Sequence, residues 1–556
     1  MTLALLPSAA WAQVTVQNDI TSDVTWTANN EYILDGLVFV DRGATLTIEA
    51  GTVIKALEAS SISTGEGASA LIVRRGAQIN AQGTASNPIV FTSEFDDLTI
   101  DDDMISEGIV DRGLWGGLII LGEAPTNNIE TLTQIEGIPG ELEAQYGGSN
   151  PADNSGTLRY ISIRHGGFSI SGIEGDEING LTMGGVGSGT TIEYIEVYAN
   201  LDDCYEWFGG TVDSRYLVGA LCGDDTFDYD QGYQGRGQFW FSIQGADIAG
   251  RGGEHDGCSG SRGVCDDTAF SQAIVSNATY IGSGVDAEPS NDDGNSPALR
   301  LRENVGAKYF NSVFTDFANR AVRIDDGDTT PDAVARFQAG DLELSNNIFG
   351  AFDAGTTWND IVRVTDAVKA DVVATFSSTN DLINGDALLG GIGRDLGTAE
   401  LDPRPMGGTA ARNSSDFSFD ELDDWFASVS FRGAFGDDNW ARGWTALSDL
   451  GYFGDFVTTD VERVDDELPT SISLKQNYPN PFNPTTMIEF ELDRAQDVRL
   501  AIYDVMGREV AVLVEGTQAA GTYRTQFDAR NLASGTYFYS LRTPQGTISK
   551  TMLLMK

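Results

Sequence analysis

Short runs of apolar and β-branched residues, each ended by glycine, recur through residues 30–450 and show no sustained helical periodicity. The run at 40–46 returns at 73–79 with the same spacing of its Val, Arg, Gly and Ala residues. The run at 158–164 returns in the same way at 192–198. Repeated short strands are typical of a solenoid, in which each coil packs only against its neighbours and the stacked coils share one core.

The tightest repeat sets the length of one coil. An acidic motif, Asp-Asp-x-x-acid-x-x-x-Gly, occupies residues 202–210 and returns 22 residues later at 224–232. Propeller blades run to about 40–50 residues, and leucine-rich repeats need a Leu/Asn frame that is missing here. We therefore expect an all-β body, a right-handed parallel β-helix solenoid over residues 13–457, followed by a smaller domain.

Three polar insertions and a change of pattern interrupt this body. The insertions, at 123–156, 250–272 and 285–296, are expected to leave the coil edges as loops. Residues 417–426 predict a short amphipathic helix, and Trp-rich turns follow up to residue 450. We expect the 416–450 segment to cap the open end of the solenoid, because an uncapped end presents unpaired strand edges.

The charge of the chain indicates which partners it does not bind, and the uneven distribution of charge indicates a boundary between two modules. Lys and Arg number 34 against 83 Asp and Glu, a formal net charge of −49. Nucleic acid and anionic membranes are therefore not expected to bind, because phosphate recognition needs clustered Lys and Arg. From Pro469 onward nine basic residues face eight acidic ones, a net charge of +1. We expect an acidic linker at 458–468 and a separate module at 469–556.

The first twelve residues predict secretion. An apolar run ends in Ala10-Trp11-Ala12, a small-x-small pattern that indicates signal-peptide cleavage before Gln13. No basic segment precedes the run, so the true start of the signal is expected upstream. No other stretch approaches the roughly 18 apolar residues that a membrane span needs.

Four cysteines fit an oxidising compartment. Cys258 and Cys265 bracket a Gly/Ser-rich loop and are expected to pair, which would leave Cys204 for Cys222. The sequence alone allows three pairings. A zinc site is not expected, because no C-x₂-C spacing occurs and the chain has only 2 histidines.

The acidic repeat is the best candidate site. A 22-residue register stacks three pairs of carboxylates on adjacent coils, namely Asp202 on Asp224, Asp203 on Asp225 and Glu206 on Asp228. Neighbouring strands lie about 5 Å apart. Like charges at that spacing must be protonated, solvated or bridged by a cation. Ca²⁺ takes about six to eight oxygen ligands, so the sequence predicts a calcium site here, with solvated turn acids as the alternative.

The same acids support an enzymatic alternative. Pectin-cleaving glycosidases of the β-helix type use an Asp pair, then a Gly-His-Gly and an Arg-x-Lys on later coils. Here the pair Asp202-Asp203 is followed by His255 and by the Arg-Leu-Arg at 300–302. The match departs in detail, since no Asn-Thr-Asp precedes the pair and arginine replaces the lysine.

Other conspicuous residues have plainer interpretations. His165 follows a predicted strand and is interpreted as a turn residue rather than a base. Trp207, Phe208, Phe239 and Trp240 alternate with polar residues and are expected in the core rather than on a carbohydrate-binding platform.

The tail resembles a known export module. A proline-rich motif opens it, and alternating strands follow up to Lys556. The motif residues are Asn477, Pro479, Asn480, Pro481, Phe482, Asn483 and Pro484. The segment is similar to the C-terminal sorting domain of proteins exported by the type IX secretion system of Bacteroidota-like bacteria. The resemblance implies a small Ig-like β-sandwich, recognition by that machinery, and Sec-dependent export followed by delivery to the outer-membrane surface or exterior of a Gram-negative cell.

The body also has relatives. Residues 112–127, 201–211 and 227–232 resemble a family of large secreted β-helix proteins that carry the same tail and have no established activity. The family by itself implies no chemistry. We expect a structural or adhesive protein of the cell surface, with an extracellular glycan or another surface ligand as its partner. The alternative is a polysaccharide-degrading glycosidase or lyase on the β-helix.

Overall fold

The structure is a computed structural model that describes residues 12–555 with short gaps. The gaps are 100–102, 107–108, 129–131, 139–143, 170–177, 259–268, 291–295, 328, 384–387, 407–408, 455–461, 466–470, 495, 504, 519–520, 530–531 and 533. Two compact units are present, Met1–Pro403 with Ala410–Gly454 and Arg404–Thr409 with Asp455–Lys556. They are the body and the sorting domain, and each is described by itself.

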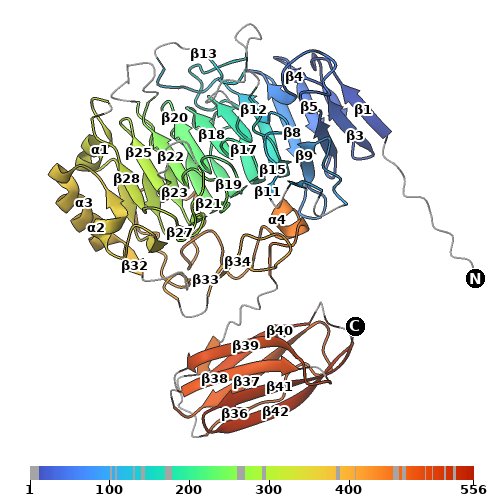
Figure 1. The fold of residues 1–556 in the computed structure, drawn as a ribbon, viewed down its shortest axis with the longest axis vertical. Coiled ribbons are helices and arrows are strands. Elements are labelled where there is room, and N and C mark those ends of the chain that lie inside the picture. Colours follow the sequence, from blue (N-terminus) through green and yellow to red (C-terminus); the bar gives the residue numbers. More distant parts are fainter. Residues whose placement is uncertain are drawn as a thin grey trace, which may run out of the picture. The chain divides into compact units, whose positions relative to one another are not determined.

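The body is a stack of coils made from two parallel sheets (Figure 1). Sheet B gives each coil one short strand, and sheet A gives it two short strands or one long bent strand. Each strand pairs in parallel with its counterpart one coil away, as β18 does with β20. The predicted parallel β-helix is confirmed, and the 22-residue register is correct, since Glu206 lies opposite Asp228.

The strands of the body have the following bounds. Sheet B contains β4 (Leu37–Val40), β7 (Ala70–Val73), β12 (Leu118–Leu121), β16 (Leu181–Gly184), β18 (Tyr205–Phe208), β20 (Phe227–Asp230), β22 (Gly253–Asp256), β25 (Leu299–Arg302), β28 (Val322–Ile324) and β31 (Val362–Arg363). Sheet A contains β1 (Ala12–Val16), β2 (Val24–Trp26), β3 (Asn30–Leu34), β5 (Thr45–Ile48), β6 (Val53–Ala56), β8 (Gln78–Gln82), β9 (Ile89–Ser93), β15 (Gly156–Arg164), β17 (Thr191–Tyr198), β19 (Ser214–Ala220), β21 (Arg236–Ile243), β23 (Ile274–Ser276), β24 (Thr279–Ile281), β26 (Lys308–Phe310), β27 (Val313–Phe317), β29 (Glu343–Ser345), β30 (Ile348–Phe352) and β32 (Asp381–Ile383). Small separate pairs are β10 (Ile105–Ser106) with β11 (Ile109–Val110), β13 (Thr133–Gln134) with β14 (Gln145–Tyr146), and β33 (Leu389–Ile392) with β34 (Leu401–Pro405).

One residue per coil bends sheet A. The residues at this bend have a left-handed backbone in seven successive coils, and they are Tyr160, Tyr194, Tyr216, Phe239, Asn277, Asn311 and Asn346. A left-handed backbone costs about 1–2 kcal/mol in most L-residues, and least in asparagine. The first four stack their rings face to face, with centroids 4.4 Å apart for Tyr160 and Tyr194. Ring stacking and packing therefore offset the backbone cost in the aromatic half of the column.

The far end of the stack is closed by helices rather than by the predicted segment. These helices are α1 (Ala333–Ala339), α2 (Trp358–Ile361) and α3 (Asp366–Thr379). Val372 and Phe376 of α3 are buried in the same apolar cluster as the coil interior. The expectation that residues 416–450 form this cap was wrong.

Residues 410–454, which we name the return segment, run back along the side of the coils toward β15 (Figure 1). Among the described residues of this segment, α4 (Ala446–Asp449) is the only helix. Residues 417–426, for which a helix was expected, form a series of turns. Trp444 packs edge-on against Tyr160 and Tyr194 of the bend column. The segment therefore covers a lateral face, because its aromatic residues fit a column that exists only after the coils stack.

Two expected loops contain strands. The 250–272 insertion includes β22, which continues sheet B between β20 and β25, so that expectation was wrong over these four residues. The 123–156 insertion leaves the coils and contains the β13–β14 hairpin. Part of the 285–296 insertion, at 291–295, lies outside the described residues.

The sorting domain consists of two four-stranded antiparallel sheets around its own apolar core. One sheet contains β35 (Glu462–Asp465), β40 (Gly521–Asp528), β37 (Thr485–Leu492) and β36 (Ser473–Leu474), and the other contains β39 (Glu509–Gln518), β38 (Gln496–Tyr503), β41 (Gly535–Thr543) and β42 (Gly546–Leu554). Since β35 pairs with β40, four residues of the expected linker belong to this sheet. An Ig-like connectivity stays a prediction.

Candidate metal centre

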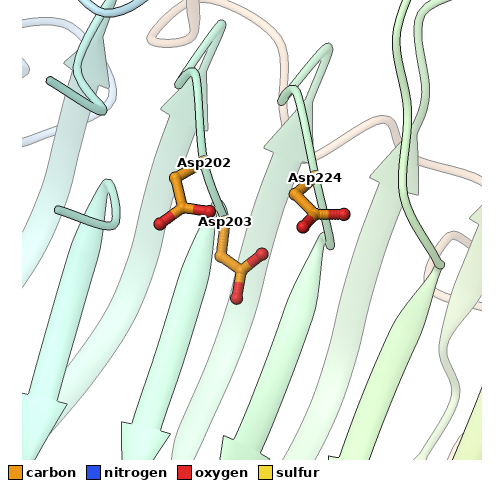
Figure 2. Close-up of side chains that lie close together, drawn as sticks. All are labelled: Asp202, Asp203 and Asp224. Carbon is orange, nitrogen blue, oxygen red and sulfur yellow. The ribbon is translucent and has the colours of Figure 1, made fainter. Parts of the chain in front are cut away.

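The predicted carboxylates gather at the corner where the chain passes from sheet A to sheet B. One coil turns through residues 199–204 between β17 and β18, and the next turns through 221–226 between β19 and β20. Figure 2 shows Asp202 and Asp203 on the first turn and Asp224 on the second, with their carboxylates near one another. The stacking inferred from the repeat is therefore present in the structure.

A second column of acids continues the cluster onto sheet B. Glu206, Asp228 and Glu254 lie opposite one another on β18, β20 and β22. They face outward, because the alternating residues Tyr205 and Trp207 are buried in the coil interior. Glu254 was not predicted as part of the cluster, because it follows Asp228 by 26 residues, not by the repeat length of 22.

Three groups of these side chains have the spacing of metal ligands. In each group the carboxylate oxygens lie within 4.8 Å of one another, and the groups are Asp202 with Asp203 and Asp224, Asp203 with Glu206 and Asp228, and Asp225 with Asp228 and Glu254. Asp228 belongs to two groups, and its Oδ1 is buried without a hydrogen-bond partner within the described residues. A buried carboxylate oxygen without a donor is costly unless it is protonated or binds a cation.

Burial and mutual repulsion raise the pKa values of this cluster. Asp203, Glu206 and Asp225 are each less than 9% exposed. Burial is the largest cause of the raised pKa of Asp203, and the charges of Asp202 and Asp225 add to it. Burial and nearby carboxylates raise the pKa of Glu206 and of Asp228 in the same way. Asp203, Glu206 and Asp225 are therefore not solvated, whereas Asp202, Asp224 and Asp228 are partly exposed.

Few donors compensate the acids. The backbone N–H of Asp225 donates to Oδ1 of Asp203 at 2.8 Å, and the side-chain amide of Asn179 donates to Glu206. Arg251 is the basic residue of the corner, and its guanidinium lies 3.5 Å from Asp225 and 3.4 Å from Glu254. The same guanidinium lies 3.6 Å from Asp224, so its charge acts on the first and the third groups of carboxylates.

A disulfide braces the same corner. Cys204, which directly precedes β18, is bonded to Cys222, which lies two residues after the end of β19. Their Cα atoms are 5.7 Å apart, and 18 residues separate them in the sequence. For the other expected pair, Cys265 lies outside the described residues.

On the outer face of sheet B, arginines follow the acids. Arg300 donates to Glu254 at 2.9 Å and to Asp325 at 3.0 Å, and Arg302 donates to Asp256 at 2.5 Å. Burial raises the pKa of Asp256 to about 8, although Arg302 opposes the shift. Because these ion pairs neutralise the acids of the later strands, the excess negative charge lies at the corner, on residues that precede Glu254 in the sequence.

His255 is separated from the acids by the sheet. Its ring is fully buried in the coil interior, stacked on Tyr229 at 3.9 Å, and its Nε2 lies 2.7 Å from the hydroxyl of Tyr309. Glu254 and Asp256 on either side of it face outward. His255 thus points into the coil interior, on the face of sheet B opposite to Glu206, Asp228 and Glu254, where its buried ring offers no base to a polysaccharide.

The predicted core aromatics are confirmed. Trp207 and Trp240 stack at 5.1 Å in the coil interior, and both are fully buried. Phe208 and Phe239 are also buried. None of the four offers a surface to a carbohydrate.

The proline-rich motif, near the start of the sorting domain, is hydrogen-bonded to its last strand. Asn477 is buried, and its side-chain amide donates to Thr486 at 3.0 Å. The backbone N–H of Phe482 donates to Leu553 of the last strand, and Asn480 accepts from the same residue. Pro479 and Pro481 follow cis peptide bonds and are exposed, as is Asn483, and the carbonyl of Pro484 accepts from Ala529.

The fold and the acid-lined corner together define a parallel β-helix protein with a separate C-terminal module. A family model described as a pectate-lyase-like beta helix domain matches residues 18–388, more than half of the chain, so the protein belongs to that family. A model described as a secretion system C-terminal sorting domain matches residues 476–555. This domain indicates export through the type IX system to the cell surface or the extracellular space.

Other comparisons add little. No curated protein matches the chain. A solved structure of a modular endo-β-1,4-mannanase from Cellulomonas fimi shares 14% identity, with a TM-score of 0.11. The match covers 44% of this chain and 47% of the mannanase chain, and so weak a likeness carries no argument. In the part of the chain that the structure describes, no helix is long and apolar enough to cross a membrane.

Proposed function

We propose that the body is a calcium-stabilised structural and adhesive protein of the cell surface. The observation that supports this most is Asp228, whose buried, unpartnered oxygen lies where two groups of carboxylates meet. Ca²⁺ binds carboxylate oxygens in flexible geometry, and each group offers three of them. Bound calcium would link neighbouring coils at the corner and remove the repulsion between their acids.

Calcium would bind the folded body in preference to the unfolded chain. The ligands come from three successive coils, so an unfolded chain would bind calcium weakly. Folding assembles the ligands, so calcium binding adds to the stability of the folded body alone. A calcium concentration of about 100 times the dissociation constant would add about 2.7 kcal/mol.

Thermal melting of the whole chain tests this proposal. We expect the unfolding midpoint to rise when Ca²⁺ replaces a chelator such as EGTA. The variant Asp228→Asn should lose most of that rise, yet in EGTA it should be at least as stable as the wild type, since one repelling charge is gone. The exposed Asp424→Asn is the matched control and should respond to calcium like the wild type.

Equal midpoints with calcium and EGTA would contradict the proposal. A loss of stability in Asp228→Asn that is the same in both buffers would also do so, because it would show a purely structural role. A glycan array probed with the body would identify the polymer or surface ligand to which the protein adheres.

A lyase or glycosidase acting on an acidic polysaccharide is the second candidate. The family description and the position of Arg300 and Arg302 on the same outer face as the acids favour it. Incubation with polygalacturonate in calcium, followed by detection of unsaturated or reducing ends, tests this activity. The adhesive proposal expects binding without either product.

A further inference from the structure

A small pocket opens on the body beside the ends of β15 and β17, and none of its lining residues belongs to the three carboxylate groups described above. Its volume is about 60 Å³. The polar side chains that line it are Asp96, Asp103, Arg164, His165, Tyr198 and Asp449. They come from the segment after β9, from the ends of β15 and β17, and from α4 of the return segment.

His165 is held in this pocket in a defined protonation state. The residue is 2% exposed and has a left-handed backbone, with φ of 61°. Its Nδ1 lies 2.6 Å from the carbonyl oxygen of Asp111. A carbonyl only accepts, so Nδ1 carries the proton and Nε2 presents a lone pair. Among the described residues nothing donates to Nε2, and burial lowers the pKa of the ring, which keeps it neutral.

The guanidinium and the hydroxyl of the pocket lining both have partners within the protein. Arg164 donates to Asp449 and to Ser162, both at 2.8 Å. The hydroxyl of Tyr198 lies 3.0 Å from that of Tyr452, with which it shares a hydrogen bond. The positive charge of Arg164 is therefore already paired with a carboxylate of the lining.

The carboxylates add acceptors and negative charge. Oδ2 of Asp96 accepts from Thr92, and Oδ2 of Asp103 accepts from the backbone of Asp97, each at 2.5 Å. A carboxylate has about four lone-pair positions, so both keep further capacity. Three carboxyl groups face one guanidinium in the lining, and the buried Glu196 also lies near that guanidinium.

A metal ion does not suit this arrangement. No group of three ligand atoms from these side chains lies within 4.8 Å in the described part of the chain. The remaining walls are apolar, formed by Leu98, Met104, Ile105 and Leu450. The pocket thus requires a ligand with several donors, a positive charge and attached carbon.

We propose that this pocket binds a primary ammonium group. Its N–H groups would donate to Nε2 of His165 and to the carboxylates of Asp96 and Asp103, while its carbon skeleton packs against Leu98 and Leu450. A lysine side chain and an amino sugar both supply this chemistry. It uses none of the residues of the calcium site.

Histidine NMR tests the proposal on the intact protein. The chain has only 2 histidines, so ¹⁵N-histidine labelling gives one set of ring signals for His165 and one for His255. His255 is an internal reference, because Tyr309 occupies its Nε2 in the core. The probes are Nα-acetyl-lysine amide and glucosamine, each paired with a neutral analogue, Nα-acetyl-norleucine amide and glucose.

We expect saturable movement of the Nε2 signal of His165 with a cationic probe and none with its neutral analogue. The cationic probe that acts identifies the source as peptide or sugar. An unmoved His165 signal with both cationic probes would overturn the proposal, and so would equal shifts with the neutral analogues.

Variants link the signal to the pocket. Asp96→Asn should weaken binding by about tenfold, while the exposed Asp424→Asn should not change it. If both variants bind like the wild type, the ammonium group lies elsewhere and the proposal fails.

Discussion

At the scale of single residues, the acids of the corner couple stability to pH. Their pKa values are raised in the folded state, so between the unfolded and folded pKa values the folded protein binds more protons than the unfolded chain. By linkage, the free energy of unfolding then falls as the pH rises. The window begins near the unfolded value of about 4 and extends to about 8 for Asp256.

The first prediction concerns this window. In EGTA, the urea concentration at mid-unfolding should be higher at pH 5 than at pH 8, with each unit of pKa shift contributing about 1.4 kcal/mol. Calcium should reduce the difference, because it replaces protons at the same oxygens. A body that is more stable at pH 8 than at pH 5 in EGTA would show that the buried acids do not govern its pH dependence.

Single residues also mark what sequence reasoning can reach. The stacking of Glu206 on Asp228 followed from a repeat of constant length. Glu254 was missed because a longer turn before β22 hides its register. His165 was interpreted as a turn residue, which its backbone agrees with, but its free Nε2 depends on Asp111 from another coil.

At the scale of elements, the return segment is held by its fit to the bend column. Side-chain amides of Asn277, Asn311 and Asn346 donate to backbone carbonyls of the segment at 2.8 Å each. The buried Glu196 accepts from the backbone of Ala446 at 2.6 Å, at the start of α4. Each coil thus supplies one contact, so the segment protects the lateral face over many coils.

The second prediction tests this element. Trp444→Ala should destabilise the body by about 3–5 kcal/mol, the usual cost of truncating a buried aromatic residue, since Trp444 is fully buried. Limited proteolysis should then cleave the return segment before the coils. The control Phe95→Ala removes a ring that is 52% exposed and should leave the cleavage pattern unchanged. Simultaneous digestion of segment and coils would contradict this layered stability.

The helices at the end of the stack show why the cap was misplaced. The helix α3 has only two buried residues, Val372 and Phe376, because it covers an end rather than a long groove. Its apolar pattern is therefore weak. The Trp-rich return segment has the stronger apolar pattern. This pattern correctly indicated that its side chains are buried, but it did not indicate that they pack against the lateral face of the coils.

At the scale of the whole molecule, body and sorting domain have separate cores. Deleting residues 469–556 should leave the unfolding midpoint of the body unchanged and prevent its appearance at the cell surface. Cell fractionation and surface proteolysis measure the location, and Val505→Ser in an exposed hairpin turn is the export control. Surface delivery of the truncated protein would contradict the role of the tail.

The boundaries 13–457, 458–468 and 469–556 remain a proposal for where such truncations should be made. The four residues of β35 argue for a deletion that also removes residues 462–465 when the sorting domain is to be removed completely. The signal peptide at 1–12 also stays a prediction, since residues 1–11 lie outside the described part.

The sequence by itself determined the repeating coil, the acidic register, the separate tail and its export signal. Each depends on local periodicity or on a motif contained in one segment, which neighbouring residues fully specify. Only the tertiary structure decided which face the return segment covers and that His255 points inward while Glu254 points outward. It also decided that Nε2 of His165 and the carboxylate of Asp96 line the same pocket. Those features join residues from distant coils, and the stacking that brings them together has no counterpart in the linear spacing.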